Sequence, residues 1–176
     1  MLDEKDYGIL LEKTNCSNYS PTSLLYYILD LTEEKKKIIT LSSEYLRLSA
    51  FEVMPKRRYF DPYKRFPDND YVYPSIEEWL SAFIMSDFIV TDSFHGTAFS
   101  IIFNKPFLVI GNEYRGLSRI YSLLEMFNLS DRLIIKGDSD SVINILQSPI
   151  DWDTVNQLRK NWKDISIDFI KKNLSS

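Results

Sequence analysis

A single histidine stands in a short polar turn, and it is the residue of this sequence best suited to catalysis. Residues 91–96 read TDSFHG, after the apolar run 88–90 and before the apolar run 97–103. His95 is the only histidine in the chain. An imidazole ring takes up or releases a proton near neutral pH, which suits general acid or base catalysis. We therefore predict His95 as a catalytic residue.

The neighbours of His95 predict an anion site. Gly96 and Thr97 open the helix expected over the following apolar run. The free N–H groups of a helix start attract anions, and a glycine lets the backbone approach a ligand closely. The hydroxyl of Ser93 would lie at the same end. We predict that Ser93, Gly96 and Thr97 bind a phosphate or a carboxylate of the substrate.

A second loop would add positive charge to this site. Residues 112–116 (NEYRG) follow another apolar run, 107–110, and contain Arg115; Arg119 falls in the first turn of the next helix. Cations at a helix start oppose the helix dipole, so they need an anionic partner or open solvent. We predict Arg115 and Arg119 as substrate-binding residues.

Other chemistries find little support. Ser93 and His95 are too close in sequence for a catalytic triad, and a Gly-x-Ser-x-Gly motif is absent. Asp92 fits a turn or cap better than a base. One histidine and one cysteine give no metal-ligand spacing, and dinucleotide and P-loop motifs are missing. We expect no metal and no cofactor. A purely structural role for the histidine remains open.

The surrounding elements predict a sheet edge for this turn. Apolar runs 88–90 and 107–110 read as buried strands joined by a helix, which is a βαβ unit of a parallel sheet. Ligands in such folds bind at the carboxyl ends of the strands. A helix before the unit begins with a capping box of Ser75 and Glu78. A helix from 117 and a strand over 133–135 follow it.

The rest of the chain completes the expected architecture. We predict strands over 7–11, 38–41 and 71–73, a helix from an N-cap at Ser20 to about residue 30, and a polar linker over 137–141. These elements form a three-layer, Rossmann-like α/β domain with a mostly parallel sheet, as one domain over residues 1–176. A final helix begins at Asp151 or Asp153. Its predicted buried face consists of Val155, Leu158, Trp162, Ile165, Phe169 and Ile170.

Residues 54–69 mix cations, aromatic rings and prolines. The simplest interpretation is a surface loop. The alternative is a surface for an anionic or sugar ligand, because cations supply charge and rings offer stacking faces. The cations are Lys56, Arg57, Arg58, Lys64 and Arg65.

Composition narrows the partners and the location. The formal net charge of −4 gives no general attraction to nucleic acid. No apolar run approaches the roughly 18 residues of a membrane span, and the N-terminus lacks the apolar core of a signal peptide. Cys16 is the only cysteine and has no internal disulfide partner. We expect a cytoplasmic location, with the inner membrane surface as a further candidate.

The stretch TDSFHGTAFSIIFNKPF closely resembles the hallmark of the polysaccharide pyruvyl transferase family. The resemblance runs from about Tyr73 to Asp131 and includes PSIEEWLSAFIMSDFIV and RGLSRIYSLLEMFNLSDR. It implies a fold similar to the two-domain GT-B glycosyltransferases, with the active site in a cleft between two Rossmann-like halves. It also implies phosphoenolpyruvate as donor and a saccharide or lipid-linked saccharide as acceptor, giving cyclic ketals on cell-envelope or exported polysaccharides.

The resemblance assigns roles to the residues that match. His95 matches the family histidine, which gives or takes the proton as the vinyl group of phosphoenolpyruvate reacts. Ser93, Gly96 and Thr97 would line the phosphate or carboxylate end of the donor, and the two arginines would add charge. A preorganised cation and a helix terminus suit a trianionic donor.

The length departs from the family pattern. Such enzymes are much longer, so we expect this chain to correspond to a C-terminal half with an N-terminal domain missing, and to be inactive alone. Two alternatives stay open: the sugar-nucleotide-binding half of a GT-B-like glycosyltransferase, and a non-catalytic interaction domain.

Overall fold

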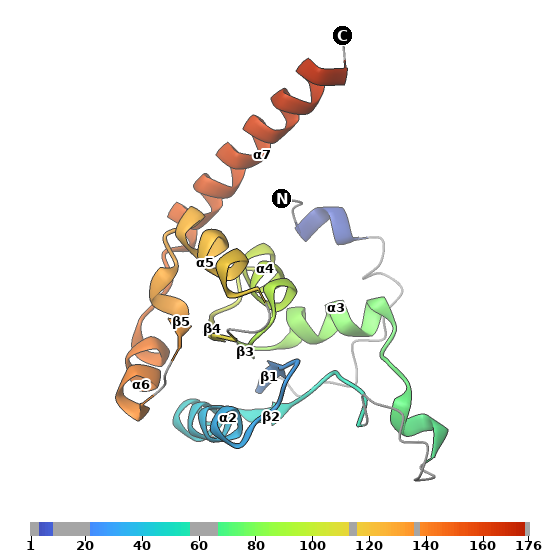
Figure 1. Cartoon of the computed structure of the whole chain (residues 1–176), viewed down its shortest axis with the longest axis vertical. Helices are drawn as coiled ribbons and strands as arrows, with labels where there is room; N and C mark the ends of the chain where they lie inside the picture. The colour runs from blue at the N-terminus through green and yellow to red at the C-terminus, as the bar shows by residue number, and fades with distance from the viewer. Residues whose placement is uncertain (1–3, 9–21, 57–66, 113–115, 136–137, 175–176) are drawn as a thin grey trace.

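The computed structural model describes residues 4–8, 22–56, 67–112, 116–135 and 138–174. Their centre is a five-stranded sheet in the order β2-β1-β3-β4-β5, in which every pair of neighbours is parallel (Figure 1). The strands are β1 (Ser23–Tyr27), β2 (Ser49–Phe51), β3 (Phe88–Thr91), β4 (Phe107–Ile110) and β5 (Leu133–Ile134).

Helices cover both faces of the sheet and make three layers (Figure 1). One face carries α2 (Glu33–Leu46) and α6 (Ser139–Gln147); the other carries α3 (Ile76–Met85), α4 (Phe94–Ile102) and α5 (Leu117–Met126). The predicted three-layer α/β fold is confirmed. The remaining elements are α7 (Trp152–Leu174) and the 3-10 helices η1 (Glu4–Tyr7), η3 (Asp68–Tyr71) and η4 (Ser130–Arg132).

Strands β3 and β4 are apolar at nearly every position because both of their faces are covered. Ile89 and Val109 belong to the core under α3, α4 and α5. Val90 and Leu108 belong to the core under α2 and α6. The uninterrupted apolar runs that predicted these two strands therefore follow directly from their central place in the sheet.

The predicted helix start at Ser75 is confirmed. Ser75 Oγ accepts from the backbone N–H of Glu78 at 3.1 Å, and the backbone N–H of Ser75 donates to the Glu78 carboxylate at 2.9 Å. The helix after β3 begins three residues earlier than predicted, at Phe94. His95 and Gly96 thus lie inside the first turn of α4 rather than in a turn before it.

The prediction of a helix over residues 20–30 was wrong: their described part contains the strand β1, which lies between β2 and β3 in the sheet. Leu24 and Leu25 are both fully buried, one in each core. This is the burial of a strand covered on two faces. The apolar spacing had suggested a helix because neighbouring apolar residues fit both patterns.

The strand predicted over 38–41 was also wrong, because these residues lie inside α2. Thr32 caps the helix by accepting from the backbone N–H of Lys35. Ile38, Ile39 and Ser42 are buried on one helical face. Tertiary packing here overrides the weak preference of β-branched residues for strands.

Three shorter predictions also differ from the structure in their described residues. Residues 71–73 form no strand: Tyr71 ends η3, and the side chains of Val72 and Tyr73 are exposed. The linker predicted over 137–141 contains the start of α6, where Asp138 caps the helix by accepting from the backbone N–H of Ser141. Tyr7 ends η1, whereas residues 9–11 of that predicted strand lie outside the described residues.

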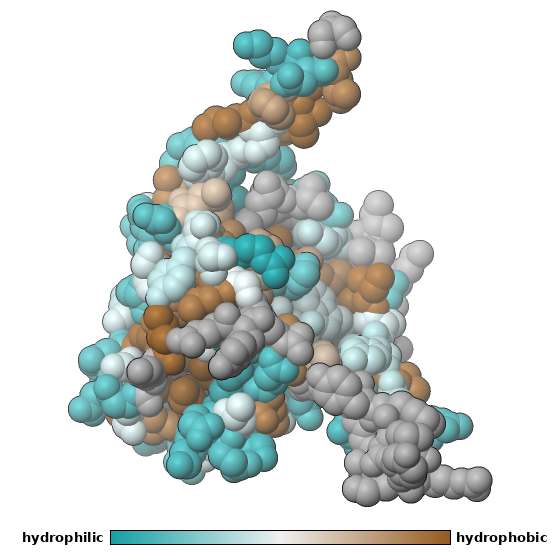
Figure 2. Space-filling model, viewed as in Figure 1, coloured by the Kyte–Doolittle hydropathy of each residue, from teal (hydrophilic) through white to brown (hydrophobic). Residues whose placement is uncertain are grey.

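Helix α7 leaves the body of the domain, and only its beginning is packed (Figure 1). Val155 is 2% exposed, whereas Ile165 is 58% and Phe169 is 68% exposed. The predicted buried face of the last helix is therefore wrong beyond its first turns. Figure 2 shows hydrophobic side chains along one side of the projecting end. None of the described helices is long and apolar enough to cross a membrane.

Candidate active site

The strand order places a topological switch point between β1 and β3. From β1 the chain moves outward to β2, and it later returns to the other side of β1 as β3. Ligands of open α/β sheets bind at the carboxyl edge where the strand order reverses. The loop after β1 and the first turn of α4 flank this edge, so the turn that carries His95 lies where the fold favours a ligand.

His95 is exposed in the first turn of α4. Ser93 is the N-cap residue, but its side chain makes no capping hydrogen bond. The N–H groups of the first turn are therefore not capped by a side chain of the described residues. An exposed imidazole beside an uncapped helix start can act as a general acid or base while the helix terminus binds an anion.

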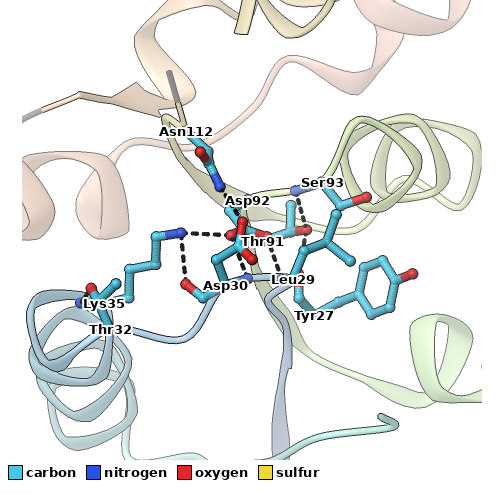
Figure 3. Close-up of polar contacts among 9 residues, drawn as sticks. All are labelled: Tyr27, Leu29, Asp30, Thr32, Lys35, Thr91, Asp92, Ser93 and Asn112. Atoms are coloured by element: carbon cyan, nitrogen blue, oxygen red, sulfur yellow. Dashed lines mark hydrogen bonds and ion pairs between the residues drawn. The ribbon is translucent and has the colours of Figure 1, made fainter. Parts of the chain in front are cut away.

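Asp92 holds the two sides of the switch point together (Figure 3). It is fully buried, and its carboxylate accepts from the backbone N–H groups of Leu29 at 2.6 Å and Asp30 at 3.3 Å. The ammonium of Lys35 lies 2.6 Å from the same carboxylate and also donates to the carbonyl of Asp30 at 2.9 Å. Asp92 thus fixes the loop after β1, whereas the sequence predicted a turn or cap role for it.

Asn112 brings a third loop into the same network. This buried residue follows β4, and its side-chain amide donates to the carboxylate of Asp30 at 2.9 Å (Figure 3). Sequence reasoning missed Asp30 and Lys35, because Asp30 was placed at the end of a predicted helix and Lys35 stands among charged residues, which are usually exposed. Lys35 is in fact 7% exposed. In the sequence, the feature that points to a special position of Lys35 is that it follows the N-cap residue Thr32 by three residues.

Gly96 is required by packing between α4 and β3. A Cβ atom at Gly96 would lie far inside contact distance of the Thr91 hydroxyl and 2.9 Å from Thr91 Cβ. That hydroxyl is itself engaged, because it donates to the carbonyl of Tyr27 at 2.7 Å and accepts from the backbone N–H of Ser93 at 3.1 Å (Figure 3). The glycine lets the helix start sit directly on the end of β3.

The other residues predicted around the ligand differ in accessibility. Thr97 is fully buried and its hydroxyl donates to the carbonyl of Ser93 at 3.0 Å. Ser93 is 3% exposed. Arg115 lies outside the described residues. Binding of substrate by Ser93, Gly96, Thr97 and Arg115 therefore stays a prediction.

The structure brings Arg119 next to the turn of His95. The guanidinium carbon of Arg119 lies 5.5 Å from the ring centroid of Phe94, a cation–π distance. The Phe94 and His95 ring centroids are 5.8 Å apart and nearly perpendicular. Gly116, with φ +71°, makes this possible, because a Cβ atom there would lie 2.7 Å from Arg119 Nη2. The first turns of α4 and α5 thus share one edge.

A different hollow lies beside the loop after β1. It has a volume of about 470 Å³ and includes Asp30, Glu52 and Lys56 in its lining. Two carboxylates against one ammonium make it a poor place for an anion. Within the described ranges, no group of three or more histidine, cysteine or acidic residues could hold a metal ion. Anion chemistry is therefore favoured on the side of α4 and α5.

Comparisons with solved structures support the fold. A glycotransferase of kitacinnamycin is 14% identical, with a TM-score of 0.52, over 86% of this chain and 43% of that chain. The apo UGT2 of Phytolacca americana is 11% identical, with a TM-score of 0.43, over 94% of this chain and 42% of that chain. The chain thus spans less than half the length of either. The first similarity gives the fold alone, that of the GT-B glycosyltransferases.

Sequence comparison identifies the family. No curated protein matches the chain. The family model of the polysaccharide pyruvyl transferases matches residues 10–114. This range begins well before the predicted extent of 73–131 and ends before α5. The matched range includes the loop after β1 with Asp30, Lys35 in α2 and the whole turn that carries His95. The chain therefore belongs to the polysaccharide pyruvyl transferase family.

Proposed function

We propose that this protein transfers a pyruvyl group from phosphoenolpyruvate to hydroxyl groups of a saccharide, with His95 as the general acid or base. Family membership supports the transferase class. The observation that carries the proposal is the exposed imidazole of His95 in the first turn of α4, at the switch point of the sheet. A cytoplasmic location and a lipid-linked acceptor are parts of the same proposal.

Formation of a cyclic ketal from phosphoenolpyruvate adds one proton to its methylene carbon. It also attaches two oxygen atoms of the acceptor to the neighbouring carbon. A proton adds to the methylene carbon of phosphoenolpyruvate, and an acceptor hydroxyl attacks the neighbouring carbon while losing its own proton. A second hydroxyl of the acceptor then displaces phosphate from that carbon and closes the cyclic ketal, and the proton of this hydroxyl leaves with the phosphate group. No oxidant or reductant is required. One imidazole can donate the first proton and accept the next, so a single histidine suffices.

The donor carries phosphate and carboxylate groups, and the site offers two means of holding them. The uncapped start of α4 presents N–H groups and the positive end of the helix dipole. Arg119 holds a guanidinium beside Phe94, one residue from the histidine. Asp92 and Lys35 neutralise each other within the fold, so the carboxylate does not repel the donor.

The active site of the whole protein would be completed by a further domain. The chain corresponds to 43% of the length of the glycotransferase that it resembles in fold. We therefore propose a cleft between this domain and a second one, with turnover only when both are present. In that complete enzyme, His95→Gln is expected to lower turnover about 10²–10⁴-fold, the usual contribution of general acid–base catalysis.

One alternative has an observation in its favour. Because the fold is shared with GT-B glycosyltransferases, the same edge of the sheet would also suit a nucleotide sugar. A glycosyltransferase half would bind the nucleotide sugar in place of phosphoenolpyruvate. Replacement of His95 would then change the activity little.

The lone histidine allows an experiment to distinguish pyruvyl transfer from glycosyl transfer. Its ring protons give one isolated set of NMR signals, which can be followed while the chain is titrated with phosphoenolpyruvate, UDP-glucose or inorganic phosphate. A shift with phosphoenolpyruvate that phosphate does not reproduce supports pyruvyl transfer. A shift with UDP-glucose alone favours the glycosyltransferase. If none of the ligands shifts the His95 ring signals, the result counts against a donor site beside His95.

A further inference from the structure

A hollow beside the first turn of α4 shares Arg119 with the proposed donor site. It has a volume of about 340 Å³ and lies between the first turn of α4 and the outer face of α5. This volume falls in the range of about 300–1,000 Å³ that is usual for small-molecule sites. The residues that line it are Phe94, Ser118, Arg119, Ser122, Leu123 and Met126.

The lining has an apolar floor and a polar rim. Phe94, Leu123 and Met126 supply the apolar part, and Leu123 and Phe94 are anchored in the core below. Ser118 and Ser122 lie one helical turn apart on α5 and are both exposed. Their hydroxyl groups therefore border the hollow on the same side.

Arg119 adds a charged donor next to Phe94. Its guanidinium lies over the Phe94 ring and close to the backbone of Gly116. The planar guanidinium presents several N–H groups. Phe94 lines the hollow, and its ring centroid lies 5.8 Å from that of His95, which itself does not line it.

We propose that this hollow, between Phe94 and Met126, is the binding site of the saccharide acceptor. The C–H faces of a sugar ring suit an apolar floor that includes an aromatic ring, and its hydroxyls suit serine and guanidinium donors around the rim. A purely apolar ligand would use the apolar floor but make no hydrogen bond with the two hydroxyls or the guanidinium. The proposal rests on pyruvyl transfer as the function, and it places the acceptor so that its reacting hydroxyl meets the donor at His95.

Two substitutions on α5 form a matched pair for the test. Ser122→Trp puts a large side chain into the hollow. Tyr121→Trp puts the same side chain at the neighbouring exposed position, which does not line the hollow. Both positions face solvent, so neither change should disturb the core.

The experiment follows backbone amide NMR signals of the chain and its two variants. The probes are the methyl glycosides of glucose, galactose, mannose and N-acetylglucosamine, with 1-hexanol as an apolar probe. We expect at least one glycoside to shift the amides of Ser118, Arg119 and Ser122. Ser122→Trp should weaken that binding about tenfold or more, and Tyr121→Trp should leave it unchanged.

Phosphoenolpyruvate is titrated in parallel to separate the two proposals. Glycoside shifts that survive Ser122→Trp, or no glycoside shift at these amides, overturn the acceptor site, as does binding of hexanol alone. If phosphoenolpyruvate still shifts His95 in those cases, the proposed function stands without this site. Glycoside binding without any response to phosphoenolpyruvate supports a saccharide site and counts against pyruvyl transfer.

Discussion

Lys35 and Asp92 form a buried ion pair across the switch point, with Nζ 2.6 Å from Oδ2. The side chains are 9% and 0% exposed, although the residues are 57 positions apart in the sequence. The pair joins the first turn of α2 to the end of β3, directly before the turn that carries His95. The pair therefore ties the start of α2 and the loop after β1 to the end of β3.

Loss of Lys35 should destabilise the protein strongly. Lys35→Met would leave the Asp92 carboxylate buried without its cation, and breaking a buried pair in this way typically costs about 3–5 kcal/mol. Urea unfolding measures the change. Lys36→Met is the matched control, because the adjacent lysine pairs with Glu33 on the surface, where an ion pair contributes about 0–1 kcal/mol. Equal effects of the two changes would contradict the assignment of a buried pair.

Gly96→Ala should destabilise the start of α4 by about 1–3 kcal/mol, the usual cost of overpacking. The added methyl group would collide with the Thr91 side chain, so the helix start must move away from β3. Thermal unfolding reports the loss, and the His95 ring signals report the movement. Gly8→Ala provides the control, because a Cβ atom there meets nothing within 4 Å. A stabilised Gly96→Ala protein, as expected for an unhindered helical glycine, would refute the close contact.

The two ends of α7 should respond differently to truncation. Val155→Ala removes a buried side chain and should cost about 1–3 kcal/mol. Phe169→Ala removes a side chain that is 68% exposed and should change the free energy of unfolding by about 0.5 kcal/mol or less. Urea denaturation of both variants tests this. A large loss from Phe169→Ala would mean that the projecting end of α7 is packed in solution.

Acid should weaken the cap of α6. The backbone N–H of Ser141, and then its hydroxyl, donate to the Asp138 carboxylate and lower its pKa below the ordinary value of 3.8. A depressed pKa stabilises the fold fully above the unfolded value, and this contribution is lost as the pH falls through the folded value. Asp138→Asn keeps a capping oxygen but does not titrate. Between about pH 6 and pH 2 the variant should lose less stability than the parent in urea unfolding.

The control for the pH experiment is a substitution in the same turn that leaves the cap in place. Ser139 is exposed, so Ser139→Ala should leave the acid dependence of the parent unchanged. The same dependence in the parent and in Asp138→Asn would show that the cap contributes nothing to the acid response.

Local signals in the sequence determined the part of the fold around the histidine. The capping box of Ser75 and Glu78 and the two apolar runs after it predicted α3, β3 and β4 in order. Each of these signals acts within a few residues, so no knowledge of distant partners is needed. The placement of His95 at a strand's carboxyl end followed from this order alone.

The tertiary structure decided the first half of the sheet and the network beneath the site. Residues 23–27 have the apolar spacing of either a helix or a strand, and only burial between β2 and β3 makes them a strand. The Lys35–Asp92 pair and the Asn112–Asp30 bond join residues 57 and 82 positions apart. Such contacts depend on which strands become neighbours, and this is set by long-range burial rather than by any local pattern.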